Sequence, residues 1–109
     1  RRLARVITRS DMSVSSGTFP PGAAVSLELR VTPAVDGPAT MRVERFDPLA
    51  GWLFHTTFRP DVRAGRAAVS FRPPAVGRWR VTGSFEGTRR AAPSEGGTAH
   101  VKVEEPLED

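Results

Sequence analysis

The chain has 109 residues, enough for one domain with a single hydrophobic core. It contains no cysteine, which excludes a disulfide framework and a thiolate metal site. No apolar run approaches the ~20 residues of a membrane-spanning helix, so we expect no membrane insertion. The formal net charge is +4, and every basic residue except Lys102 is an arginine. Ten glycines and ten prolines are spread along the chain, which favours short strands joined by turns.

Alternation of apolar and polar residues predicts seven short strands. Between residues 25 and 31, for example, valine or leucine at every odd position alternates with polar residues, as in a strand with one buried face. Turn-forming glycine and proline separate the strands. In chain order, the expected strands span residues 3–8 (continued after a break by 11–16), 24–32, 39–46, 52–59, 67–72, 77–87 and 98–104.

The strand expected at 77–87 organises the core. Trp79, Val81 and Phe85 point to one side of it, and its arginines point to the other. A tryptophan on the inner face buries more area than any other side chain. We therefore predict Trp79, Val81 and Phe85 as the core anchors.

The strand expected at 52–59 is apolar or neutral almost throughout. Trp52, Phe54 and Phe58 share one parity, whereas Leu53 and His55 share the other. Both faces are apolar enough to meet a core, so the pattern leaves open which of them is buried.

Seven strands with turn signals roughly every ten residues predict an all-β fold, a two-sheet antiparallel sandwich. A five-stranded barrel is the competing architecture, and it has too few strands. We place the sandwich at residues 1–103. Residues 104–109 are interpreted as an acidic C-terminal linker or tail, because four of these six residues are acids.

Short motifs in the second half of the chain carry a family resemblance. Pro73-Pro74 leads into Gly77-x-Trp79-x-Val81 and then Phe85-x-Gly87, and Gly51-Trp52 opens an earlier strand. On these motifs, residues 24–103 resemble the bacterial immunoglobulin-like domains that occur as repeats in secreted and cell-surface proteins. The resemblance implies an immunoglobulin-like sandwich in which Trp79 takes the corner position and Val81 takes the position of a cysteine in disulfide-bearing domains. It transfers no functional residues.

The same resemblance implies a non-catalytic module of a bacterial extracellular or cell-surface protein, serving as a spacer or adhesion/interaction element. Its partners are then neighbouring domains of the same chain. An odd number of strands that alternate up and down predicts that Val6 and Val103 lie at opposite ends of the long axis, as in a bead on a string. An accessory domain of a secreted enzyme is an alternative interpretation.

The sequence holds little that supports catalysis. It has no Gly-x-Ser-x-Gly motif, and only His55 and His100 are available as bases. No histidine pair has ligand spacing, and no acidic cluster has the form of a calcium loop. We therefore expect no enzymatic activity, no metal and no cofactor. We also expect no nucleic-acid partner, because the aromatic residues of 77–87 share the inner parity and its arginines the outer one.

The excess of positive charge favours an alternative function, binding of a polyanion. Alternating strands bring the loops after the second, fourth and sixth strands to one pole, and these loops carry Arg63, Arg89 and Arg90. These three arginines are the candidate residues for binding an acidic glycan, a cell-wall polymer or an acidic protein partner. The competing interpretation is compositional, because the arginines are dispersed along the chain.

Overall fold

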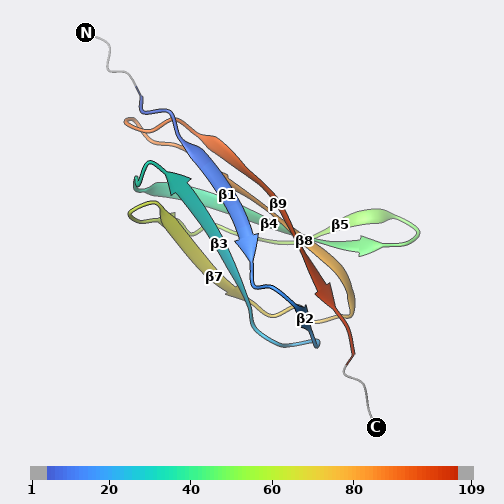
Figure 1. Cartoon of the computed structure of the whole chain (residues 1–109). Helices are drawn as coiled ribbons and strands as arrows, with labels where there is room; N and C mark the ends of the chain where they lie inside the picture. The colour runs from blue at the N-terminus through green and yellow to red at the C-terminus, as the bar shows by residue number, and fades with distance from the viewer. Residues whose placement is uncertain (1–4, 106–109) are drawn as a thin grey trace.

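The structure is a computed structural model, and it describes residues 5–105 of the chain (Figure 1). The regular elements of this range are all β-strands, and none of it forms a helix that could cross a membrane. The strands are β1 (Arg9–Val14), β2 (Thr18–Phe19), β3 (Val25–Thr32), β4 (Gly37–Asp47), β5 (Gly51–Phe58), β6 (Asp61–Val62), β7 (Arg66–Phe71), β8 (Gly77–Phe85) and β9 (Ser94–Val103).

The strands form two sheets, which confirms the prediction of an all-β sandwich. The small sheet has the order β1-β3-β7, and the large, six-stranded sheet has the order β2-β9-β8-β4-β5, with β6 pairing to β4. The predicted strand count and the wholly antiparallel pairing both need correction. The described residues contain nine strands, because two segments predicted as turns each form a two-residue strand, β2 and β6. The large sheet is mixed, because β2 pairs with β9 in parallel.

The first strand begins later than expected. Residues 3 and 4 of the predicted strand 3–8 lie outside the described residues, and Val6 forms only an isolated bridge with Ala91. The side chain of Thr8 is buried and donates its hydroxyl to the carbonyl of Ala92 at 2.7 Å. This segment therefore fastens the N-terminal side of the chain to the start of β9, and regular pairing with β3 starts at Arg9.

The core lies between the sheets and is centred on β8. The alternation predicted for this strand is confirmed, since its buried residues occupy every second position. Trp79, Val81 and Phe85 are each 1% exposed. The Trp79 indole packs edge-on against Phe71 of the small sheet at 5.6 Å between ring centroids, and its Nε1–H donates to the carbonyl of Ala75 at 3.0 Å. Trp79 thus links the two sheets and leaves no polar atom unpaired.

Two glycines let the sheets approach closely beside this core. A Cβ on Gly83 would lie 2.5 Å from Met12 Sδ, and one on Gly96 would lie 2.6 Å from Leu29 Cδ1. A side chain at either position would force the ends of the Met12 and Leu29 side chains to move. The two glycines therefore make room for these core side chains along this edge.

A β-bulge in the β4–β5 pair answers the question left open by the sequence. Val43 pairs with Thr56, but the next residue of β4, Glu44, pairs with Phe54, so His55 is an extra residue in β5. One extra residue reverses the parity of a strand. Phe58 therefore packs against the core, whereas the ring of Phe54 lies on the outer face.

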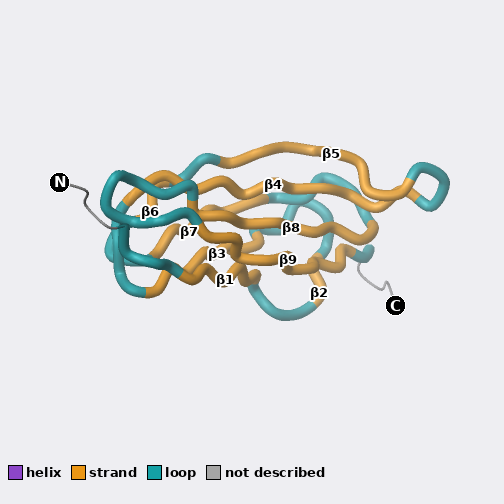
Figure 2. Tube along the Cα trace, turned by 90° about the horizontal axis from the view of Figure 1, so that it is seen from above, coloured by secondary structure: helices purple, strands orange, loops and turns teal. Residues whose placement is uncertain are grey.

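The β4–β5 hairpin projects beyond the rest of the sandwich (Figures 1 and 2). Pairing of β4 with β8 ends at Arg45, and the last two residues of β4 pair with β5 alone. At the tip, the Asp47 carboxylate accepts the N–H groups of Leu49 and Ala50, and these bonds lower the pKa of Asp47 below its ordinary value. Leu49 is 99% exposed, so the tip presents an apolar side chain to solvent.

The chain enters and leaves the sandwich at opposite ends, as predicted. Val6 lies beside Ala91 in the connection between β8 and β9. Val103 lies at the other end of β9, opposite Gly77 at the start of β8. Both views show β1 and β9 running from one end of the molecule toward the other (Figures 1 and 2). Of the predicted acidic tail, Glu104 donates its N–H to Phe19, and residues 106–109 lie outside the described residues.

Replacement of Trp79 tests its position in the core. We expect Trp79→Ala to lower the free energy of unfolding by about 3–5 kcal/mol, because it removes a buried ring that contacts both sheets. Trp52→Ala is the matched control, since the Trp52 ring lies on the outer face and its loss should cost about 1 kcal/mol. Denaturant melts of both variants measure the difference. A loss from Trp79→Ala no larger than that of the control would contradict the assignment.

Candidate functional site

The loops that carry the three predicted site arginines meet at one end of the sandwich. Val6 bridges to Ala91, and its N–H donates to the carbonyl of Arg90 at 2.8 Å. Asp36 lines one depression together with Arg90 and a neighbouring one together with Arg63. The structure therefore brings Arg63 and Arg90 to the same end, which we call the N-terminal pole and define by Val6, Asp36, Asp61, Arg63 and Arg90.

The N-terminal pole is mixed in charge. Asp36 and Asp61 line the same depressions as its arginines, and the Asp36 carboxylate accepts the Ala64 N–H at 2.7 Å. Arg89 is exposed next to Arg90, in a turn that Thr88 closes by accepting the Arg90 N–H at 3.1 Å. Anion binding by Arg63, Arg89 and Arg90 stays a prediction, and the two carboxylates at the pole weaken the case for it.

A second cluster, which the sequence pattern did not predict, lies on the outer face of the large sheet. Aromatic rings from β4 and β5 lie there among arginines from β4 and β8. A histidine and a lysine of β9 extend the cluster toward the other side of β8. We call it the aromatic–arginine face, and its residues are Arg42, Phe46, Trp52, Phe54, Arg78, Arg80, His100 and Lys102.

Each aromatic ring of this face has a guanidinium group beside it. The distances from the guanidinium carbon to the ring centroid are 4.3 Å for Arg80 and Trp52, 4.9 Å for Arg42 and Phe54, and 6.0 Å for Arg78 and Phe46. Such contacts combine cation–π attraction with stacking of two planar groups. The rings therefore restrict the arginines to particular positions on the sheet.

Trp52 is at the centre of the aromatic–arginine face. Its ring centroid lies 5.3 Å from that of Phe46 and 6.0 Å from that of His100. Because Arg80 covers it as well, Trp52 is partly buried although it lies outside the core. A side chain on the projecting β5 thus reaches across β4 and β8 to a residue of β9.

Glu44 is the acidic residue within this cluster, and it is only 9% exposed. Its Oε1 accepts the Arg80 Nε–H at 2.8 Å, and its Oε2 lies 3.7 Å from Arg42 Nε. One carboxylate therefore holds two guanidinium groups in place, and its charge opposes theirs.

A shallow depression of about 350 Å³ opens beside the cluster. Gly17, Arg78, His100, Val101 and Lys102 line it. Arg78 and Lys102 are direct cross-strand neighbours in the β8–β9 pair, so two positive side chains project from adjacent positions at its rim. The depression is therefore cationic on one side and adjoins the Trp52–His100 pair on the other.

The two histidines lie against tryptophan rings. His55, the extra residue of the bulge, lies edge-to-face with Trp79 at 4.9 Å between ring centroids, and His100 lies beside Trp52. Within residues 5–105, no group of three histidine or acidic side chains is arranged to hold a metal ion. Both histidines are exposed, and each lies beside a tryptophan ring.

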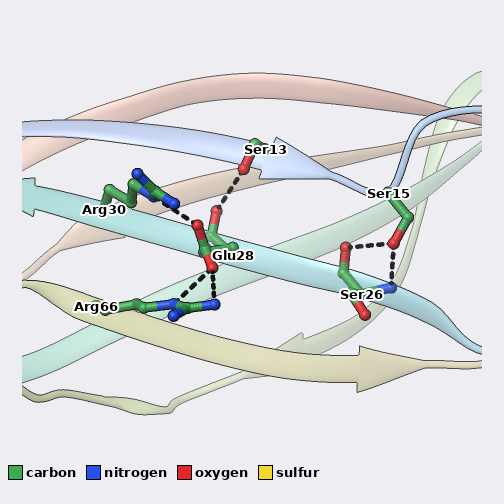
Figure 3. Close-up of polar contacts among 6 residues, drawn as sticks. All are labelled: Ser13, Ser15, Ser26, Glu28, Arg30 and Arg66. Atoms are coloured by element: carbon green, nitrogen blue, oxygen red, sulfur yellow. Dashed lines mark hydrogen bonds and ion pairs between the residues drawn. The ribbon is translucent and has the colours of Figure 1, made fainter.

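The outer face of the small sheet has a different arrangement of charge (Figure 3). Glu28 lies between Arg30 and Arg66, and each guanidinium approaches a separate carboxylate oxygen at 2.6 Å. The hydrogen bond from Arg30 is the main cause that lowers the pKa of Glu28 below its ordinary value, and Arg66 adds to it. This carboxylate is therefore shared by two arginines on neighbouring strands.

Comparison with known proteins does not identify a family. No protein-family model matches the chain, and no curated protein matches it. The immunoglobulin-like resemblance therefore stays a prediction from the motifs of the sequence.

The Glu28 cluster gives a testable dependence of stability on pH. A carboxyl whose pKa is lowered by folding stabilises the fold fully above its unfolded pKa, and this contribution is lost as pH falls through the folded pKa. We expect Glu28→Gln to lower the free energy of unfolding at pH 7. This loss of stability should become smaller as the pH falls below 4.5, the ordinary pKa of a glutamate.

Urea melts at pH 7, 5, 4 and 3 measure this difference. Glu95→Gln is the control, because it removes the same charge from an exposed side chain that forms no ion pair among residues 5–105. A stability difference for Glu28→Gln that persists unchanged at pH 3 would contradict the role assigned to this carboxylate.

Proposed function

We propose that this chain is a non-catalytic, immunoglobulin-like module of a bacterial extracellular or cell-surface protein, where it serves as a spacer or adhesion/interaction element. Neighbouring domains of the same protein are its first partners. The family name rests on the motifs around Trp79, and the role rests on the path of the chain.

The path of the chain is the observation that supports this proposal most. Val6 lies at one end of the sandwich and Val103 at the other. The molecule is elongated, with principal extents of 67 × 28 × 16 Å. A module with this path adds length between whatever precedes it and whatever follows it, whereas ends on one side would fold neighbours back on each other.

The surroundings of the two histidines support a non-catalytic role. His55 and His100 are engaged with tryptophan rings, at 4.9 Å and 6.0 Å between centroids. A catalytic base needs to reach a substrate or a nucleophile by a hydrogen bond. Packing of both histidines against rings fits a structural use of these residues.

A tandem of two copies of the 109-residue chain in one polypeptide tests the spacer role. We expect small-angle X-ray scattering to give a maximum dimension approaching twice that of the single chain, because each copy leaves at the end opposite to its entry. A second tandem with a flexible Gly/Ser linker between the copies is the control, and it should give a broader distribution of distances. A direct tandem as compact as two copies side by side would refute the spacer role.

A further inference from the structure

We infer that the aromatic–arginine face binds an acidic polysaccharide, with Arg78 and Lys102 as the main anion contacts. This inference rests on the adhesion role proposed above and leaves the spacer role untouched. It also moves the predicted anion site away from the N-terminal pole, where Arg63 and Arg90 share their surface with two aspartates.

The first support is an unbalanced pair of positive charges. Arg78 and Lys102 are direct partners across β8 and β9, and like charges in this position destabilise a sheet. Lys102 has Glu104 at 2.9 Å, but both of these side chains are more than half exposed. Within residues 5–105, no carboxylate forms an ion pair with Arg78. A bound oxyanion between the two cations would relieve their repulsion.

The second support is that neighbouring rings hold the guanidinium groups in place before any ligand binds. Arg78 lies 6.0 Å from the Phe46 ring, and Arg80 lies 4.3 Å from the Trp52 ring and donates to Glu44. An arginine positioned in this way loses less side-chain freedom on binding. Its planar fork matches the two oxygens of a carboxylate or sulfate group.

The third support is the shape of the surface. The depression lined by Arg78, His100 and Lys102 is about 350 Å³ and is shallow, at the small end of ligand sites. It accommodates one short unit of a longer chain better than a compact molecule. Arg80 and Arg42 continue beyond it across the sheet and share the single carboxylate of Glu44, so a linear ligand with repeated negative charges meets two guanidinium groups that one acid compensates only in part.

The arrangement of the rings favours a polysaccharide over single-stranded nucleic acid. Sequence-tolerant binding of nucleic acid uses aromatic rings on which bases stack. Here each of the three rings already has a guanidinium group beside it. Recognition through oxyanions at the arginine forks requires no free ring face. Carboxylated and sulfated polysaccharides share this chemistry, and the binding experiment separates them.

The site is first located on the unmodified chain by nuclear magnetic resonance. The chain has two tryptophans, Trp52 on the aromatic–arginine face and Trp79 in the core, so two indole N–H signals report on the two places. We expect oligogalacturonate, which carries only carboxylates, to shift the Trp52 signal and leave the Trp79 signal unchanged. Trp52→Leu assigns the signals and should weaken binding without altering the net charge. An unshifted Trp52 signal at saturation would overturn the inference.

Two double variants with the same change in net charge provide the matched comparison. Arg78→Gln/Lys102→Gln removes two charges from the face, and Arg89→Gln/Arg90→Gln removes two from the loop at the other end. We expect the first to weaken binding of oligogalacturonate or dextran sulfate by about tenfold or more, and to flatten its salt dependence. The second should change affinity less than about twofold. Equal losses would leave only a general effect of net charge and would overturn the inference.

Two further measurements complete the design. Arg78→Lys/Lys102→Arg keeps both charges but removes the guanidinium group beside Phe46, so it should keep the salt dependence of binding and lose less affinity than the glutamine variant. Denaturant melts of both double variants show whether a loss of affinity comes from misfolding. Oligogalacturonate carries carboxylates and dextran sulfate carries sulfate groups, so the polysaccharide that binds more tightly identifies the preferred oxyanion. Tighter binding of poly(dT) than of either polysaccharide would overturn the inference in favour of nucleic acid. The tandem experiment does not depend on these results, so failure here is distinguishable from failure of the spacer role.

Discussion

The packing of Trp79 against Phe71 and His55 is the interaction on which the rest of the structure depends. It joins β8 of the large sheet to β7 of the small sheet, and His55 of β5 contacts both of these rings. Once Trp79 is fixed inside, the alternation of β8 places Arg78 and Arg80 outside. The core contact therefore also decides which surface of the molecule carries these charges.

Because of the bulge at His55, one part of β5 faces the core and the other part faces outward. Thr56 and Phe58 lie opposite Val43 and Met41 of β4, which face the core. In a regular strand Trp52 and Phe54 would share that inner parity, but the extra residue reverses it beyond His55. The exposed His55 contacts the core rings Phe71 and Trp79 from its edge, and the outer face receives the two large rings that hold its arginines. A single local irregularity thus produces the aromatic–arginine face.

Sequence reasoning recovered the regular parts of this fold and missed the irregular ones for a physical reason. Period-two alternation located β3 and β8 and their buried residues, because each of these strands has one wet and one dry face. The two-residue strands β2 and β6 have no period to detect, and they lie in segments rich in turn residues. The rings of the outer cluster belong to β4 and β5, so the inward parity of the aromatic residues of β8 does not reveal them. The sequence feature that indicates this cluster is the run of apolar residues at both odd and even positions of 52–59. A strand that is apolar on both faces does not determine which face is buried.

Composition could count the positive charges but could not say where they remain unbalanced. On the small sheet, Glu28 approaches two arginines at 2.6 Å each, and on the large sheet Glu44 lies between two more. These two carboxylates, each placed between strands, account for much of the local compensation on the sheet faces. Arg78 and Lys102 are neighbours across β8 and β9, and Lys102 pairs with Glu104, whose side chain is about half exposed. Strand pairing brings Arg78, one of several arginines that form no ion pair among residues 5–105, directly opposite Lys102, which is distant from it in the sequence. For this reason a dispersed arginine pattern is compatible with a localised anion-binding surface.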